Sequence, residues 1–442
     1  MIQKFYFIGF GAVATSLVEI MNLEKDFYNI PFVIIEPKIL KHPELFKNRN
    51  VIHIKKPLTK DNYKILLKDC DDKTLVIDLS VDVDSIMMLE CSKEKGFYYI
   101  NASIENYVDE NEHRHGDDLT YNDIKKDTLF HRQLIVDNLL KGTKKTRLVN
   151  FSINPCGIQQ FFKRGIREYA KMKGVKFNDG NYARLCNQLG LQKILLSEYD
   201  SQKTKLKPNK NLGLNTWGVD ALCLEAADES VLVINNNDLK KMEDKGVKLI
   251  KPDEGGIDAN NIRFLTTRGM NKKDVSYYLD SSGNPHKYSG FLISHAEITS
   301  LGQFLEYKKN TPTIMYIYRV CDVAEQTLNL CRDNNYKPLS KQYVLENKDI
   351  LPKGFDSIGA LMIFENGDRL WCGTVLTIEQ VRKLGLKIAQ PTTTQAGAFV
   401  YAGIKFIINN PNYSLNEGET VPHKELFKYI EKYLGHIFCK LI

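Results

Sequence analysis

The sequence has no long apolar run. No stretch of its 442 residues approaches the roughly 18 or more uncharged apolar residues that a membrane helix needs, and the longest apolar runs, near Leu361 and Phe399, are core-sized. An apolar content of 43% and a charged content of 26% are ordinary for a soluble globular protein. We therefore expect no membrane span, and a chain of two or three domains with ample length to bury a core.

Closely spaced cysteines are also absent. The chain has nine cysteines, an odd number, and no C-x-x-C pair. This set predicts buried thiols in a reducing compartment, and hence a cytoplasmic location. His113 and His115 could ligate a metal, but they lie among acids in a polar stretch that is typical of a solvated loop, so we predict no metal site.

The charge is not concentrated in any one region. The formal net charge is +7, but it is spread along the chain, and acidic residues interrupt the lysine runs throughout. Without a basic patch the sequence gives no indication of nucleic-acid binding.

Residues 1–40 hold the clearest motif that the chain does have. A short aromatic strand at 4–8 runs into Gly9-Phe10-Gly11-Ala12-Val13-Ala14, a G-x-G-x-x-A turn, and a helical stretch follows at 15–21. A second apolar strand at 32–35 ends on Glu36. Strand, glycine turn, helix, strand and acid in this order form the fingerprint of a dinucleotide-binding site.

The residues of this motif have distinct physical tasks. Gly9 permits the tight turn, Gly11 lets the backbone approach a pyrophosphate, and the helix N-terminus at Ala12 and Val13 offers N–H groups to that anion. Glu36 would accept hydrogen bonds from the adenosine ribose, and its negative charge would repel a 2′-phosphate. The motif therefore predicts NAD rather than NADP.

Two other interpretations of the segment stay open. The glycine turn could be purely structural. The segment could also be a signal peptide, because Lys4 precedes an apolar stretch that contains Ala12-Val13-Ala14.

Short apolar strands alternate with helices beyond Glu36. We expect strands at 51–54, 74–78, 97–100 and 147–151, and helices at 59–68, 85–95, 124–141 and 157–172. This alternation predicts an α/β fold with a doubly wound, Rossmann-like parallel sheet. Because the carboxyl ends of parallel strands meet at one edge, the cofactor crevice should be lined there by Ser80, Val81, Asp82, Ala102 and Glu105.

The chain divides into three predicted parts. Residues 1–153 should form the NAD-binding domain. In 154–390 longer apolar segments are separated by polar loops, which predicts a second, α+β domain for substrate binding and dimerisation. Residues 391–442 are expected to be helical and to pack back on the first domain.

A second group of residues stands out beyond the cofactor domain. Glu198 and Asp200 follow an apolar stretch that we interpret as a helix, Trp217 is one of only two tryptophans, Glu225 follows it on an apolar stretch, and His295 ends an apolar strand. Taken singly, each has a structural alternative. Trp217 and His295 could be core residues, and the two glutamates could lie on solvated helix faces.

Together these residues make the sequence resemble the bacterial-type NAD-dependent homospermidine synthases, which are relatives of the saccharopine dehydrogenases. The resemblance extends from about Phe7 to Asn412, and its matching blocks are Ile8-Gly9-Phe10-Gly11, Leu79-Ser80-Val81-Asp82, Ser103-Ile104-Glu105, Asn154-Pro155, Glu198 with Asp200, Asn215-Thr216-Trp217, Gly290-Phe291-Leu292 with His295 and Glu297, and Asn410-Pro411-Asn412. Such a set is far more specific than a glycine turn.

The resemblance implies a reaction and a set of roles. Two putrescines, or putrescine and spermidine, would be joined into homospermidine by a homodimer, with NAD taking a hydride and later returning it. The site residues would be the acids Asp82, Glu105, Glu198 and Glu225, the amide Asn154, the indole Trp217 and the imidazole His295. Glu105 is followed by Asn106-Tyr107 where relatives tend to have proline and tryptophan, and Cys156 stands where glycine is usual.

This chemistry needs these residue types. A diamine is a dication near neutral pH, since alkyl amines have a pKa of about 10.4, and carboxylates can hold its charged ends. An indole stabilises the positive charge that grows as an iminium forms. His295, or a carboxylate whose pKa is raised by burial, would remove the amine proton.

Two rival functions stay open. A saccharopine- or carboxyspermidine-type dehydrogenase would join an amine to a carbonyl with net consumption of NAD(P)H, but its substrates carry carboxylates and call for arginines. A non-catalytic NAD-binding protein would keep Gly9, Gly11 and Glu36 without needing Trp217 and His295.

Overall fold

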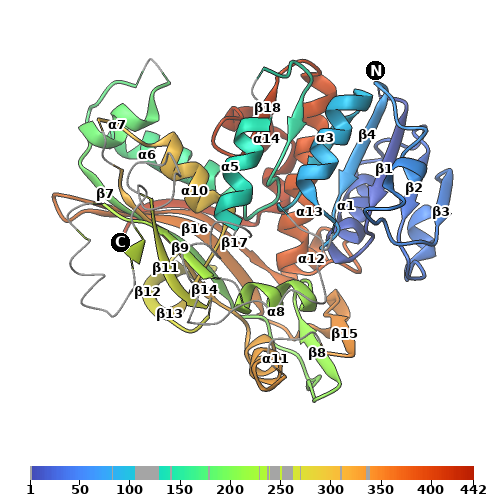
Figure 1. Ribbon diagram of the computed structural model, residues 1–442. Helices are drawn as coiled ribbons and strands as arrows, with labels where there is room; N and C mark the ends of the chain where they lie inside the picture. Colours follow the sequence, from blue (N-terminus) through green and yellow to red (C-terminus); the bar gives the residue numbers. More distant parts are fainter. Residues whose placement is uncertain are drawn as a thin grey trace.

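The molecule contains two large sheets, one at the right of Figure 1 and one at its left and centre, each with its own helices. The computed structural model describes residues 2–81, 83–104, 129–139, 142–177, 180–227, 229–235, 238, 249–250, 262–268, 270–308, 311–334 and 339–442. Within these residues no helix is long and apolar enough to cross a membrane.

The first sheet is wholly parallel. Its order is β18-β6-β5-β4-β1-β2-β3, and its strands are β1 (Lys4–Ile8), β2 (Phe32–Ile35), β3 (Val51–Ile54), β4 (Thr74–Asp78), β5 (Tyr98–Asn101), β6 (Arg147–Leu148) and β18 (Leu415–Asn416). The helices connecting its strands are α1 (Ala12–Leu23), α2 (Tyr63–Leu66), α3 (Ser85–Lys95) and α5 (Leu129–Leu139). The predicted doubly wound parallel sheet is confirmed.

Several element boundaries differ from the prediction. Helix α1 begins at Ala12, within the glycine motif, instead of at residue 15. The helix expected at 59–68 is limited to α2, because the Asn62 side chain accepts a hydrogen bond from the Thr59 N–H and holds the preceding residues in a turn. The strand expected at 147–151 ends at Leu148, since Asn150 adopts a positive φ of 55°.

The second sheet has ten strands of mixed direction. They are β7 (Leu191–Asp200), β9 (Glu229–Val233), β10 (Leu249–Ile250), β11 (Ile262–Arg268), β12 (Lys273–Leu279), β13 (Pro285–Ile293), β14 (Thr313–Arg319), β16 (Phe355–Phe364), β17 (Arg369–Thr377) and β19 (His436–Leu441). The apolar stretch before Glu198, expected to be a helix, is strand β7. It lies between β14 and β16, and a strand buried on both faces has the same continuous apolar pattern as a buried helix.

The remaining elements surround this sheet and join it to the first. The helices are α6 (Gly157–Met172), α7 (Tyr182–Gln188), α8 (Val219–Ala227), α10 (Ala296–Phe304), α11 (Asp322–Asp333), α12 (Ile378–Lys383), α13 (Pro391–Asn409) and α14 (His423–Ile430). Strands β8 (Leu212–Asn215) and β15 (Lys341–Val344) form a small parallel pair, and short 3₁₀ turns cover Pro43–Phe46, Asn347–Asp349 and Glu431–Tyr433.

Helix α13 connects the two halves of the molecule. It lies between the sheets in Figure 1 and packs against α1, where a Cβ added at Gly397 would come within 2.9 Å of the Leu17 nitrogen. The lack of a side chain at Gly397 therefore permits this close approach. The carboxylate of Glu19 in α1 accepts N–H hydrogen bonds from residues 387–389, just before α13.

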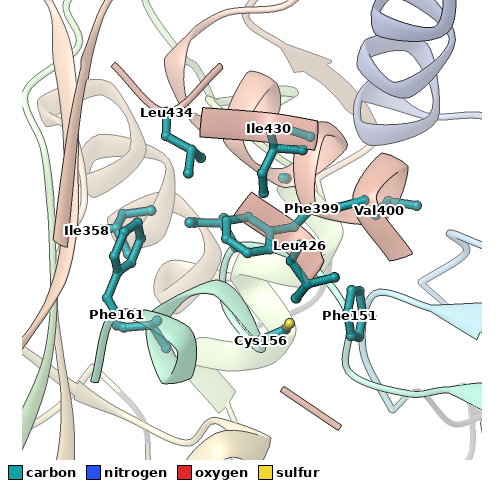
Figure 2. Close-up of a cluster of buried hydrophobic side chains, with 14 of the residues drawn as sticks. Phe151, Cys156, Phe161, Ile358, Phe399, Val400, Leu426, Ile430 and Leu434 are labelled. Atoms are coloured by element: carbon teal, nitrogen blue, oxygen red, sulfur yellow. The ribbon is translucent and has the colours of Figure 1, made fainter. Parts of the chain in front are cut away.

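A buried apolar cluster fixes the end of the chain in place. Figure 2 shows Phe399 and Val400 of α13 with Leu426 and Ile430 of α14, close to Phe161 of α6. Strand β18 pairs with β6 of the first sheet and β19 with β17 of the second, so residues 391–442 contact both sheets. The domain limits at 153 and 390 remain predictions.

One cysteine pair differs from the expectation of free thiols. Cys223 of α8 and Cys331 of α11 form a disulfide, although 108 residues separate them. The packing of α8 against α11 brings the two together, and sequence spacing alone could not indicate it. The other seven cysteines are free, and all but Cys439 are buried.

Candidate active site

A cavity of about 250 Å³ lies where the carboxyl edge of the parallel sheet meets the mixed sheet. The parallel sheet and α1 contribute Val13, Ser80, Val81 and Ala102 to its wall, and the rest of the chain contributes Asn154, Glu198, Trp217, Glu225 and His295. These predicted residues, which span most of the sequence, are thus brought to one place. Asp82, Glu105, His113 and His115 lie outside the described residues.

Gly9 and Gly11 of the glycine turn do not line this cavity, whereas Val13 of the same motif does. Gly9 has a φ of +73°, and a Cβ there would lie 2.9 Å from the Ser80 nitrogen, so the turn requires glycine. A Cβ at Gly11 would meet no atom within 4 Å, which leaves open space above the backbone where helix α1 begins at Ala12. A helix N-terminus beneath open space fits a pyrophosphate group.

The carboxylate of Glu36 is fixed beside this turn. Its Oε2 accepts the Phe10 N–H at 2.9 Å, and its Oε1 accepts the Lys38 N–H at 2.9 Å. The acid at the end of β2 is therefore oriented toward the glycine turn, where the ribose of a dinucleotide would lie. Gly9, Gly11, Ala12 and Glu36 fit a dinucleotide with an unsubstituted ribose.

Glu198, Asn154 and Tyr316 form a closed group that we call the carboxylate–amide triangle. Asn154 Nδ2 donates to Glu198 Oε2 at 2.7 Å and to the Tyr316 hydroxyl at 2.6 Å, and that hydroxyl donates to Glu198 Oε2 at 2.6 Å. Glu198 is only 2% exposed, so it does not lie on a solvated helix face. Burial raises the pKa of Glu198 to about 8, and the charge of Asp200 adds to the effect.

Two further acids lie directly behind Glu198. Asp200 is the residue two positions along β7, and Asp356 is its register partner on β16. Burial raises the pKa of each, in the case of Asp356 with the charges of Glu198 and Asp200 acting in the same direction. The Thr216 hydroxyl donates to Asp200 at 2.7 Å and so connects these acids to the segment that carries Trp217. The buried acids disfavour ionisation of one another, and they make this end of the cavity attractive to a cation.

His295, Glu225 and Glu297 form a second group, the imidazole triad. His295 Nε2 lies 3.0 Å from Glu225 Oε1, and Nδ1 lies 3.0 Å from Glu297 Oε2. Burial opposes protonation of His295, but the two carboxylates outweigh it and raise its pKa well above the ordinary value. The two carboxylates therefore favour the protonated ring, in which each nitrogen can donate to one of them.

Trp217 borders the cavity and is not a core residue. The indole is half-buried in the wall, and its Nε1–H donates to the Tyr318 hydroxyl at 2.9 Å. The other tryptophan, Trp371 on β17, is fully buried in the second sheet. The two indoles thus have different surroundings, and only that of Trp217 offers surface to a ligand.

Several residues of the site were not predicted. Tyr316 and Tyr318 lie on β14, Glu297 matched the resemblance without receiving a role, and Arg132 on α5 also borders the cavity. The sequence did contain one indication of the two tyrosines. Tyr316 and Tyr318 are two positions apart in a β-branched and apolar run, so they share a face of a strand. Within the described residues, no group of three His, Cys, Asp or Glu side chains is arranged to hold a metal.

Comparison with known sequences supports the resemblance seen in the blocks above. Residues 5–128 match the family described as saccharopine dehydrogenase NADP binding domain. The chain is 22% identical to the homospermidine synthase of Mesorhizobium japonicum, over 97% of this chain and 88% of that protein. It is 23% identical to the homospermidine synthase of Blastochloris viridis, over 97% and 89%. The predicted resemblance is confirmed.

Comparison with solved structures supports the fold. The homospermidine synthase of Legionella pneumophila, solved in complex with NAD, has a TM-score of 0.82 at 24% identity, covering 100% of this chain and 91% of that one. The apo saccharopine dehydrogenase (L-Glu forming) of Saccharomyces cerevisiae has a TM-score of 0.50 at 10% identity, with both chains covered completely. Both sheets and their arrangement are therefore shared with a solved structure.

Proposed function

We propose that this chain is an NAD-dependent homospermidine synthase, which joins two putrescines, or putrescine and spermidine, with release of ammonia or diaminopropane. One observation above all supports the proposal. A single cavity next to the dinucleotide turn combines an indole, two carboxylates and an imidazolium, contributed by Trp217, Glu198, Glu225 and His295.

The acids of the cavity bind the cationic ends of the diamine. Glu198 and Glu225 border the same space from β7 and α8, and charge-assisted hydrogen bonds to an ammonium are shorter and stronger than neutral ones. The imidazolium of His295 does not repel the substrate, because Glu225 and Glu297 on either side give the imidazole triad a net negative charge when both are ionised. Arrival of a cation at Glu198 also favours the ionised form of this carboxylate.

The oxidation step creates a positive charge, which Trp217 stabilises. Gly9, Gly11, Ala12 and Glu36 would hold NAD at the parallel sheet, with Ser80, Val81 and Ala102 forming the adjoining wall. When bound there, NAD would supply a reversible hydride acceptor, so no net consumption of NAD is expected. The face of an indole stabilises a nearby cation by roughly 0.5 to 2 kcal/mol.

We assign the base to the carboxylate–amide triangle and proton donation to the imidazole triad. A base works best when its pKa lies near the working pH, and Glu198, with a pKa of about 8, meets this condition. The raised pKa of His295 favours its protonated form, which can donate a proton but cannot accept one. Of the two bases that the sequence left open, a buried carboxylate therefore fits better than the histidine.

A dehydrogenase of the saccharopine or carboxyspermidine type is the second candidate. Arg132 favours it, because this side chain borders the cavity and a guanidinium is suited to a substrate carboxylate. Against it, the acids Glu198 and Glu225 would repel the same carboxylate. We rank the diamine substrate first because the acids outnumber the arginine among the described residues of the wall.

The test is to incubate the purified protein with putrescine and a catalytic amount of NAD. We expect homospermidine and ammonia in equal amounts, many product molecules per NAD, and no steady accumulation of NADH. A parallel reaction with 2-oxoglutarate, an amine and NADPH examines the second candidate. Net oxidation of NADPH there, with no homospermidine in the first reaction, would overturn the proposal.

Two properties remain predictions that follow from the same proposal. We expect a homodimer, as the resemblance implies, and a cytoplasmic location. Asp82 and Glu105 keep their predicted roles in substrate binding.

A further inference from the structure

We propose that Tyr316 is a positioning residue that holds Glu198 and His295 in one fixed arrangement. The inference rests on the proposed function, because it assigns a part to Tyr316 in that same reaction. It concerns a residue that neither the motif nor the resemblance indicated.

Tyr316 lies on the strand between those that present the two groups. Strand β14 pairs with β7, which carries Glu198, on one side and with β13, which leads into His295, on the other. Tyr316 is the register partner of Ile293, two residues before His295. One buried side chain can therefore touch both groups at once.

The hydroxyl of Tyr316 completes the carboxylate–amide triangle. It donates to Glu198 Oε2 at 2.6 Å and accepts from Asn154 Nδ2 at 2.6 Å, so both of its hydrogen-bonding functions are satisfied. Glu198 Oε2 receives two donors and is fixed in position. A fixed carboxylate loses less freedom when it binds the substrate ammonium.

The ring of Tyr316 fixes the imidazole triad as well. It stacks on the His295 ring with a centroid distance of 4.4 Å and an angle of 18° between the planes. The stacked ring covers one face of the imidazole, while Glu225 and Glu297 hold its nitrogens. Rotation of His295 is thus blocked by contacts from three directions.

The hydroxyl also influences the charge of Glu198. Its hydrogen bond favours the ionised form of the carboxylate and lowers the pKa that burial raises. The other titratable groups near Glu198 are Asp200 on β7, Asp356 on β16, Glu225 on α8, His295 and Glu297 at α10, and Tyr318 on β14. Removal of the Tyr316 hydroxyl substitutes none of these other groups.

The experiment compares Tyr316→Phe with Tyr316→Leu and with a matched control. Phenylalanine keeps the stacked ring and removes the hydroxyl, whereas leucine removes both. The control is Tyr169→Phe, because the Tyr169 hydroxyl donates to Asp368 at 2.7 Å in a similar tyrosine–carboxylate bond outside the cavity wall. The readout is the pH dependence of kcat/KM for putrescine.

We expect the low-pH limb of Tyr316→Phe to move upward by about one pH unit, since a hydrogen bond to a charged group is strong enough for such a shift. Tyr316→Leu should show the same shift and a further drop in kcat, and Tyr169→Phe should follow the wild-type profile. An unchanged profile in Tyr316→Phe, with folding intact by circular dichroism, would overturn the proposal.

A second readout does not depend on catalysis. Infrared difference spectra across a pH titration report protonated carboxyl groups, and the band missing in Glu198→Gln identifies Glu198. We expect its midpoint to be higher in Tyr316→Phe than in the wild type. If the midpoint moves but the wild type makes no homospermidine, the proposed function fails and the positioning role stands. If homospermidine forms and the midpoint does not move, the positioning role fails alone.

Discussion

The two halves of the site are built differently. The cofactor half consists of main chain and one acid within residues 9–36. The turn at Gly9, the open space at Gly11 and the N-terminus of α1 together form the site that fits a pyrophosphate. The substrate half consists of side chains from β7, α8, β14 and the start of α10, joined by hydrogen bonds. One half depends on local conformation, and the other on contacts between distant segments.

This difference extends to electrostatics. In the substrate half Glu198, Asp200 and His295 have raised pKa values. Burial is the main cause for the two acids, and the neighbouring carboxylates are the cause for His295. Apart from the carboxylate of Glu36, the cofactor half relies on fixed N–H groups and a helix terminus, which do not titrate. Substitutions in the two halves should therefore separate turnover from cofactor binding.

Glu198→Gln should have the largest effect. Glutamine keeps the shape but cannot carry the charge that holds the ammonium or accept its proton, and we expect kcat/KM for putrescine to fall by about 100-fold. The affinity for NAD, measured by calorimetry, should stay at the wild-type value. Glu365→Gln, which removes an exposed acid outside the cavity wall, serves as the control. A parallel loss of NAD affinity would contradict the separation of the two halves.

Trp217→Ala should have the next largest effect. Loss of the indole face should lower kcat by about 10- to 30-fold, while Trp217→Phe keeps part of the activity because a smaller aromatic face remains. The comparison is with Trp371→Phe, which alters the buried core and should lower the melting temperature without changing kcat. If Trp217→Ala instead loses stability, turnover and NAD affinity together, Trp217 is a structural residue.

Gly9→Ala and Gly11→Ala should have the smallest effect on turnover. They test whether the cofactor half affects NAD binding without affecting the chemistry of the substrate half. A Cβ at Gly9 meets Ser80 at a positive φ, so we expect a lower melting temperature and weaker NAD binding. A Cβ at Gly11 meets no protein atom within 4 Å, so Gly11→Ala should not lower stability. The methyl group would occupy the space of the pyrophosphate and should weaken NAD binding by about tenfold. Both variants should approach the wild-type kcat when NAD is saturating. A low kcat at saturation would show that the cofactor half also governs the chemistry.

The cofactor half could be predicted because its signals are short-range. The strand, the turn and the acid follow one another in the chain, and the spacing of Gly9, Gly11 and Glu36 is enough to place them at one sheet edge. The residues of the substrate half are indicated by the family resemblance, and the secondary structure predicted for them is partly wrong. Leu191–Asp200 is a central strand, and its continuous apolar pattern cannot be distinguished from that of a buried helix.

Contacts between distant segments could not be predicted from the sequence. The position of Tyr316 between Glu198 and His295 depends on the order β13-β14-β7, which local patterns do not specify. Likewise the pairing of Cys223 with Cys331 depends on how α8 packs on α11.

The amino-acid sequence by itself determined the parallel sheet, the dinucleotide turn and the kinds of side chain available for a polyamine, because periodicity and turn chemistry are local. Tertiary structure alone decided that Glu198 is a buried acid with a pKa of about 8, that His295 lies between two carboxylates that raise its pKa, and that Tyr316 touches both. The physical reason is that a charge state depends on burial and on neighbours, and here the neighbours come from segments far apart in the chain.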